Sequence, residues 1–93
     1  MNKRKAREVL ARELDGYRAM SYAELVELIG HIAAYEVALA GGCRYQIEIQ
    51  VFWDSQPDRD VRVIGSVDDG GLSAFFPLTD SFIMSPGGEL VGE

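Results

Sequence analysis

Apolar and polar side chains alternate along residues 44–53 almost without a break. Because successive side chains of a strand point to opposite faces of a sheet, this alternation predicts a strand with one buried face. The buried face should consist of Tyr45, Ile47, Ile49, Val51 and Trp53. The opposite face should carry Arg44, Gln46, Glu48, Gln50 and, in the same phase, Phe52. We therefore expect an antiparallel sheet that packs one face on a core.

Two segments before this strand show the spacing of amphipathic helices. Apolar side chains recur three and four residues apart along the first segment, which predicts a helix over about residues 3–15 that ends at Gly16. Ser21 and Glu24 have the spacing of a capping box, and apolar residues follow them at helical intervals. A second, shorter helix is therefore expected over about residues 21–29.

Strand patterns also flank the long alternating run. The pairs Gly41-Gly42 and Asp69-Gly70 provide the positive φ values that tight hairpin turns require. The alternation predicts strands over about residues 34–40, 44–53, 61–67, 72–76 and 81–85. The expected fold is α+β, with two N-terminal helices packed on one face of a four- to five-stranded antiparallel meander sheet, in a single domain over residues 1–93.

Composition and length favour an ordinary globular domain. The 93 residues are 47% hydrophobic and 26% charged, far from the composition of disordered chains. No apolar stretch approaches the roughly 20 residues that a membrane helix needs, and no apolar signal core follows the charged first residues. The lone Cys43 has no partner for an intramolecular disulfide. These features predict a cytoplasmic protein that makes no membrane contact.

The charges are unevenly distributed along the chain. Residues 1–20 hold six basic and three acidic side chains, a balance of +3, whereas the remaining residues have a balance of −9. A basic helix could bind nucleic acid or another anion, with an affinity that falls steeply with salt. The candidate residues for this role are Lys3, Arg4, Lys5, Arg7 and Arg12. Because the acidic remainder repels phosphates and the second predicted helix carries no cation, nucleic acid is the less favoured partner.

No signature of catalysis, cofactor binding or metal binding stands out. The sequence contains no Gly-rich phosphate loop, no paired cysteines and no Gly-x-Ser-x-Gly elbow. The carboxylates within residues 54–60 and 68–70 lack the alternate spacing and closing glutamate of a calcium loop. We therefore expect solvated turns at these positions, and no catalytic residue, cofactor or metal ion.

Several apolar side chains are expected on the side of the sheet that faces away from the core. Phe52 is one of them, and at least one residue each of Phe75-Phe76 and Phe82-Ile83-Met84 must also point outward. Exposed apolar patches of this kind often mark contacts with another protein, unless the C-terminal tail folds over them or the sheet curls enough to bury them. Unpaired edge strands offer a second route to self-association.

Three functional hypotheses follow, in order of preference. The first is a small acidic, non-enzymatic module that binds a protein partner or a second copy of itself through the sheet face around Arg44, Glu48, Phe52 and Arg62. The second is the anion binder described above. The third is a ligand carrier or enzyme with a pocket between helices and sheet, which requires a cleft with convergent polar groups.

Overall fold

The α+β class and the antiparallel sheet are confirmed by the computed structural model, which describes residues 1–71 and 76–93. The described strands form one sheet in the order β1-β2-β3-β4, with each neighbouring pair antiparallel, so the chain forms a meander. The elements are α1 (Lys3–Arg18), α2 (Tyr22–Glu27), β1 (Ile32–Ala38), β2 (Arg44–Trp53), β3 (Val61–Asp68) and β4 (Leu78–Met84). No helix in the described ranges is long and apolar enough to cross a membrane.

Helix α1 begins at Lys3, directly after its N-cap residue Asn2, and it ends later than expected. The side chain of Asn2 accepts a hydrogen bond from the backbone N–H of Lys5 at 3.0 Å, which satisfies one of the free donors of the first turn. The prediction that the helix stops near Gly16 is wrong, because α1 continues to Arg18. Tyr17 packs against the core, and Asp15 accepts a hydrogen bond from Arg18 at 2.9 Å. These contacts offset the roughly 1 kcal/mol that an interior glycine costs a helix.

Helix α2 is formed by the expected capping box. Ser21 Oγ accepts from the backbone N–H of Glu24 at 3.1 Å, and the carboxylate of Glu24 accepts from the backbone N–H of Ser21 at 2.9 Å. The hydrogen bond from the Ser21 backbone holds the pKa of Glu24 below its usual value. The helix is shorter than the expected 21–29, since Leu28 is its C-cap and Gly30, at φ +87°, turns the chain into β1.

The bounds of β1 and β4 differ from the expected ones. Strand β1 starts two residues earlier and ends two residues earlier than the expected 34–40, because the hairpin closes with the backbone N–H of Leu39 donating to Cys43. Strand β4 starts at Leu78 rather than at 81, opposite Val67 of β3. The strand predicted over 72–76 falls largely on residues 72–75, outside the described residues.

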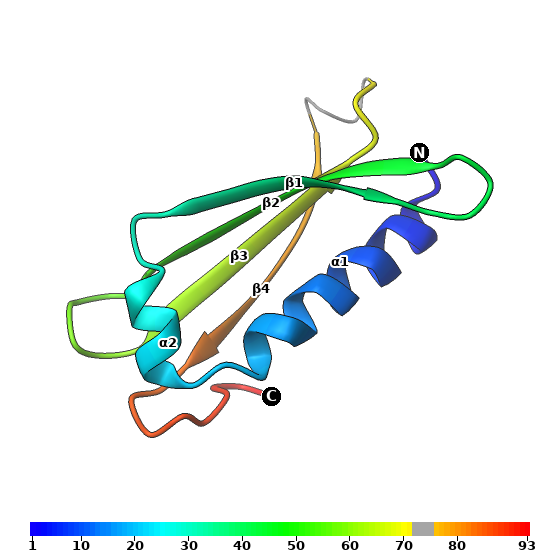
Figure 1. Cartoon of the computed structure of the whole chain (residues 1–93). Helices are drawn as coiled ribbons and strands as arrows, with labels where there is room; N and C mark the ends of the chain where they lie inside the picture. The colour runs from blue at the N-terminus through cyan, green and yellow to red at the C-terminus, as the bar shows by residue number, and fades with distance from the viewer. Residues whose placement is uncertain (72–75) are drawn as a thin grey trace.

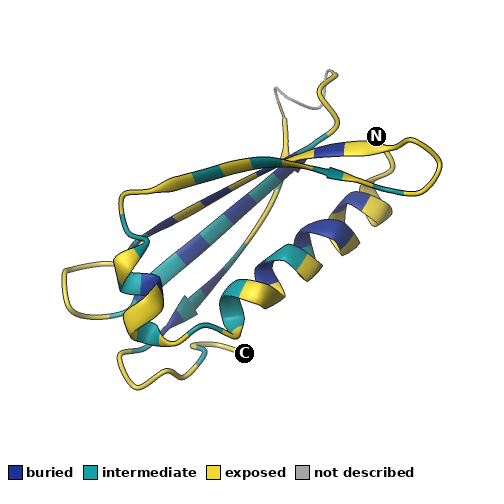
Figure 2. Ribbon diagram, viewed as in Figure 1, coloured by how far each residue is buried: buried dark blue, intermediate teal, exposed yellow. Residues whose placement is uncertain are grey.

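The core lies between the helices and one face of the sheet (Figures 1 and 2). Helix α1 lies along β3 and β4, and α2 contacts β2 and β3. Four of the five side chains expected on the buried face of β2 are at most 4% exposed, and Trp53, at its end, is half-buried. Leu10, Leu14 and Leu25 of the helices complete this core.

The C-terminal segment folds back beside β4. Leu90 forms an isolated bridge with Met84, and the backbone N–H of Val91 donates to the carbonyl of Ile83 at 2.9 Å. Glu93 lies 3.5 Å from Arg18 of α1. The tail therefore occupies part of the free edge of β4 and leaves the sheet face beyond it uncovered by residues 85–93.

Candidate interaction surface

The sheet face that points away from the helices is here called the outer face. Among the described residues, no helix or strand lies over it (Figure 1). The cross-strand register places its side chains in rows. Its side chains are Ile32, Ala34, Glu36 and Ala38 of β1; Arg44, Gln46, Glu48, Gln50 and Phe52 of β2; Arg62, Ile64, Ser66 and Asp68 of β3; and Thr79, Ser81 and Ile83 of β4.

The four predicted interaction residues all lie on the outer face, but the structure brings only two of them together. Phe52 and Arg62 are direct cross-strand partners. Arg44 is eight residues from Phe52 along β2, which corresponds to about 26 Å at roughly 3.3 Å per residue. Glu48 lies midway between them. The predicted residues therefore lie at the two ends and in the middle of the outer face along β2. The two ends differ in the side chains that surround them.

One end of the outer face is apolar and is organised around Arg62. The Nε of Arg62 donates to Asp54 Oδ1 at 2.8 Å, and Nη1 lies 3.4 Å from Ser81 Oγ. The side chains of Arg62 and Asp54 are only 32% and 26% exposed, so this pair is partly shielded from water. Phe52 and Ile83 are the cross-strand neighbours of Arg62 on the same face. The pair therefore fixes a planar cation within an apolar surrounding.

The other end of the outer face carries a polar network around Glu36. Its carboxylate accepts from Gln46 Nε2 at 2.7 Å and from Arg44 Nη1 at 2.8 Å. Both donors come from β2, the neighbouring strand. The hydrogen bond from Gln46, followed by that from Arg44, holds the pKa of Glu36 below its usual value of 4.5.

This network predicts a specific titration. The Glu36 carboxyl should titrate below 4.5, and its pKa should rise toward that value in Gln46→Ala and in Arg44→Ala. Because the folded-state pKa is lowered, the contribution of Glu36 to stability is present above pH 4.5 and is lost as the pH falls through the folded pKa. Carboxyl NMR during an acid titration measures the shift. Gln50→Ala is the matched control, and a wild-type Glu36 that titrates at or above 4.5 contradicts the network.

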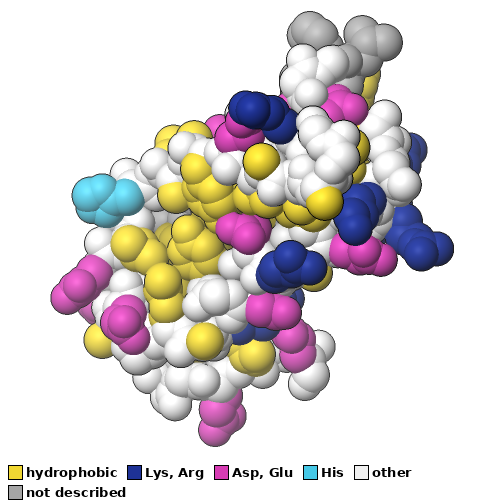
Figure 3. Space-filling model, turned by 45° about the vertical axis from the view of Figure 1, so that its right-hand side comes forward, with side chains coloured by type: hydrophobic (Ala, Val, Ile, Leu, Met, Phe, Trp, Pro, Cys, Tyr) yellow, Lys and Arg dark blue, Asp and Glu magenta, His cyan; other side chains and the backbone are white. Residues whose placement is uncertain are grey.

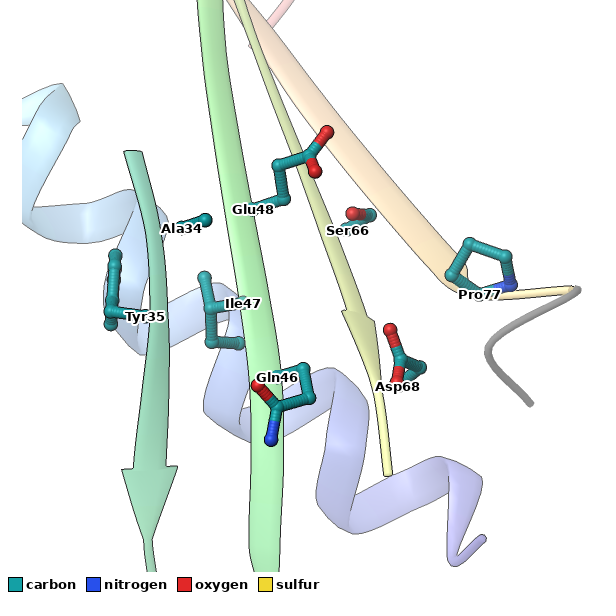
Figure 4. A pocket seen from close by; sticks show the side chains of 8 residues that line it. All are labelled: Ala34, Tyr35, Gln46, Ile47, Glu48, Ser66, Asp68 and Pro77. Carbon is teal, nitrogen blue, oxygen red and sulfur yellow. The ribbon is translucent and has the colours of Figure 1, made fainter. Parts of the chain in front are cut away.

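A hollow of about 440 Å³ lies on the outer face near the polar end. Figure 4 shows Glu48, Ser66, Asp68 and Pro77 around it, with α1 behind the sheet. Glu48 accepts from the side-chain amide of Gln50 at 3.0 Å, and Asp68 accepts from the backbone N–H of Gly70 at 2.7 Å. Both carboxylates are thus bonded by uncharged donors, and the hollow is acidic.

The sequence pattern did not single out the residues that give the outer face its two different ends. Ser66 and Asp68 share the phase of Arg62 on β3, and Ile83 lies opposite Arg62 on β4. Alternation alone assigns each of them to a face. Only the lateral register between strands shows which of them are neighbours. Asp54 was expected in a solvated turn, yet it binds Arg62 at the edge of the face.

None of the protein-family models, the curated proteins or the solved structures matches this chain.

The outer face offers few groups for metal chemistry. Within the described ranges, no three His, Cys, Asp or Glu side chains gather closely enough to hold a metal ion. The acidic hollow contains two carboxylates, Glu48 and Asp68, together with a hydroxyl and an amide. Such a set can accept hydrogen bonds and can attract a cationic side chain.

The alternative anion-binding residues are all exposed on α1, but they are spread along it. Lys3 and Arg12 are nine residues apart, about 13 Å along the helix axis at 1.5 Å per residue. Arg4 lies 3.7 Å from Glu8, and Arg7 borders a separate hollow that also contains Asp80. The five cations are therefore spread along α1, with Glu8 between the first four and Arg12, and the structure does not gather them into one anion site.

Proposed function

We propose that this chain is a cytoplasmic, non-enzymatic protein-interaction module that binds a partner protein through its outer face. The observation that carries the proposal is the uncovered outer face itself, which joins an apolar end around Phe52 and Arg62 to an acidic hollow around Glu48 and Asp68. Protein interfaces combine in this way a dry aromatic and arginine centre with a polar surrounding.

The apolar end supplies the anchor for such a partner. Phe52 is half-buried between its neighbours, and Ile32, in the adjacent row, is 63% exposed. A second exposed aromatic side chain lies outside this end: Phe76 is 85% exposed and directly precedes Pro77, which lines the acidic hollow. Exposed aromatic side chains of this size are costly in water and are enriched at the centres of interfaces. They are matched by apolar side chains on the partner.

The acidic hollow specifies the charge of the partner. The two arginines of the outer face are already held by Glu36 and Asp54, at 2.8 Å each. Glu48 and Asp68 accept their hydrogen bonds from uncharged groups, the Gln50 amide and the Gly70 backbone. The outer face therefore presents net negative charge, within a chain of net charge −6. A partner with lysine or arginine side chains beside an apolar patch complements it.

We expect binding of the partner protein to be lost when an exposed aromatic residue, Phe52 or Phe76, is replaced by a charged one. In affinity capture from cell extract, proteins held by the wild-type chain should be missing from Phe52→Asp and from Phe76→Asp. Arg4→Ala, on the far side of the molecule, should retain them. For a purified partner, loss of a central aromatic anchor costs about 2 kcal/mol, or roughly thirtyfold in Kd. Titration calorimetry measures this difference, and the surfaces of the captured proteins should be basic.

Two outcomes contradict the proposal. One is capture of the same proteins by the wild type and by both aspartate variants, with the circular dichroism of the variants unchanged. The other is a set of proteins that is lost from Arg4→Ala instead, which transfers the binding role to the basic face of α1. Phe76→Asp keeps the comparison meaningful if Phe52→Asp unfolds, because the 85% exposed Phe76 side chain contributes little to packing.

A further inference from the structure

The free edge of β1 is an unprotected strand edge. Strand β1 is the first strand of the sheet order, and among the described residues no strand or loop pairs with its far side. Its sequence from Ile32 to Ala38 contains no proline and no lysine, and its register with β2 runs without a bulge. Natural sheets block free edges with such devices, because an open edge can pair with another chain. The other edge strand, β4, is partly covered by Val91.

The hydrogen-bond pattern shows which backbone groups point to the free edge. Leu39 donates to Cys43 across the hairpin, so odd-numbered residues of β1 direct their N–H and C=O toward β2. The even-numbered residues Ala34 and Glu36 then direct theirs outward, as do both ends of the strand. These groups can form a further antiparallel ladder without breaking any bond to β2.

The side chains next to this edge are apolar and incompletely covered. Ala33, Tyr35 and Val37 lie on the inner side of β1 and are half-buried, although neither helix packs mainly on this strand. Figure 3 shows hydrophobic side chains gathered between β1 and the two helices. Tyr35 is held in place there, since its hydroxyl donates to Glu13 of α1 at 2.6 Å. These three residues are here called the β1 flank.

We propose that two copies of this chain pair through β1, antiparallel and around a two-fold axis at Tyr35, and so form one continuous sheet of eight strands. This register places Ala34 of one copy opposite Glu36 of the other, and Ala33 opposite Val37. Apolar residues of the β1 flank then meet apolar residues across the axis. The two Glu36 side chains are not opposite each other, and each is already bonded by Arg44 of its own chain.

The two-fold symmetry also explains why a second copy fits better than an unrelated strand. An axis perpendicular to the sheet keeps the helices of both copies on one side, so both β1 flanks are covered at once. A register with the axis at Glu36 instead places the two Glu36 side chains directly opposite, which is destabilising. The inference does not depend on the proposed function, since the outer face remains free and becomes twice as wide in the dimer.

Light scattering over an about hundredfold range of protein concentration tests the proposal, because mass action converts monomer to dimer as the concentration rises. The wild type should approach twice the mass of the 10.3 kDa chain. Ala34→Pro should stay monomeric, because proline removes an N–H that faces the free edge and not β2. Monomer at every concentration overturns the proposal, and so does a dimer that persists in a folded Ala34→Pro.

Cysteine crosslinking tests the register and does not rely on the proline variant. In a Cys43→Ser background, Tyr35→Cys should form an intermolecular disulfide on mild oxidation, because facing residues of a non-hydrogen-bonded pair lie about 4.5 Å apart at Cα. Val37→Cys is the matched control and should crosslink poorly, since it faces Ala33 of the second copy. Equal crosslinking of both variants, or none at Tyr35→Cys, overturns the proposed pairing.

Discussion

Replacing Ile49 with alanine should lower the free energy of unfolding by about 2 to 5 kcal/mol. Ile49 is 1% exposed in the middle of β2, between Ala33 of β1 and Gly65 of β3. The shorter side chain loses the transfer free energy of three carbon atoms and leaves a cavity under α1 that the rigid sheet cannot close. Small domains have roughly 5 to 15 kcal/mol of stability in total, so this one change removes a large share. Urea denaturation measures it.

The matched control for this prediction is one residue away on the opposite face. Glu48→Ala should change the free energy of unfolding by less than about 0.5 kcal/mol, because Glu48 is exposed and its carboxylate accepts a single side-chain hydrogen bond, from Gln50. Equal losses in Ile49→Ala and Glu48→Ala would mean that the two faces of β2 are not different environments. That result would contradict the facing assigned to the whole sheet.

The elements that could be predicted from the sequence are those specified by patterns within a short stretch of residues. Ten residues that alternate from Arg44 to Trp53 specify a strand, its two faces and its bounds, because a slip of one residue would expose Ile47 and bury Glu48. The capping box of Ser21 and Glu24 likewise specifies the start of α2, since its two hydrogen bonds form within four residues. Local rules sufficed where the deciding contacts are local.

The predictions failed where distant contacts decide. Gly16 is a sound local signal for a helix end, but the packing of Tyr17 on the core keeps α1 going to Arg18. The start of β4 at Leu78 is set by its pairing with Val67, eleven positions earlier in the chain, and no local pattern reveals this pairing. Tertiary contacts override local propensity in both cases.

For the candidate interaction surface too, the sequence predicts local features but not contacts between distant residues. Alternation placed Arg44, Glu48, Phe52 and Arg62 on one face, but their grouping depends on the register between strands. The acidic hollow needs Ser66 and Asp68 of β3 beside β2, and Pro77 ahead of β4. Ser66 and Asp68 are 18 and 22 residues from their cross-strand partners Glu48 and Gln46, so no local spacing records these neighbours. A face can be predicted from sequence, whereas a pocket on it requires the fold.

Replacing Gly65 with alanine should lower the free energy of unfolding by about 1 to 3 kcal/mol, as overpacking of a filled core does. Gly65 is buried where α1 packs on β3. A Cβ at this position would lie 2.8 Å from Leu10 Cδ1, 3.0 Å from Ile49 Cδ1 and 3.2 Å from Leu14 Cδ2. Each of these atoms ends a flexible side chain, but all three side chains are packed in the core and cannot all move aside. The helix must shift outward instead.

A glycine-to-alanine substitution at an exposed helix position should raise the free energy of unfolding instead of lowering it. Gly16 lies in the exposed part of α1 with nothing within 4 Å of an added Cβ, so Gly16→Ala should raise the free energy of unfolding by roughly 0.5 to 1 kcal/mol. The contrast separates the loss of space from the general effect of a methyl group on the unfolded chain. If Gly65→Ala also stabilised the protein, the close approach of α1 to β3 would be contradicted.

A double-mutant cycle identifies the contact that makes Gly65 necessary. Leu10→Ala alone should cost about 2 to 5 kcal/mol, because Leu10 is 2% exposed and its removal leaves a cavity. In the double variant the new methyl group at position 65 enters the space that Leu10 vacates, so its cost should be less than the sum of the two single changes. Coupling of about 0.5 to 3 kcal/mol is typical of residues in contact, whereas independent sites add. Strict additivity would show that α1 does not rest on β3 through Leu10, and would assign the cost of the added methyl group to Ile49 and Leu14 instead.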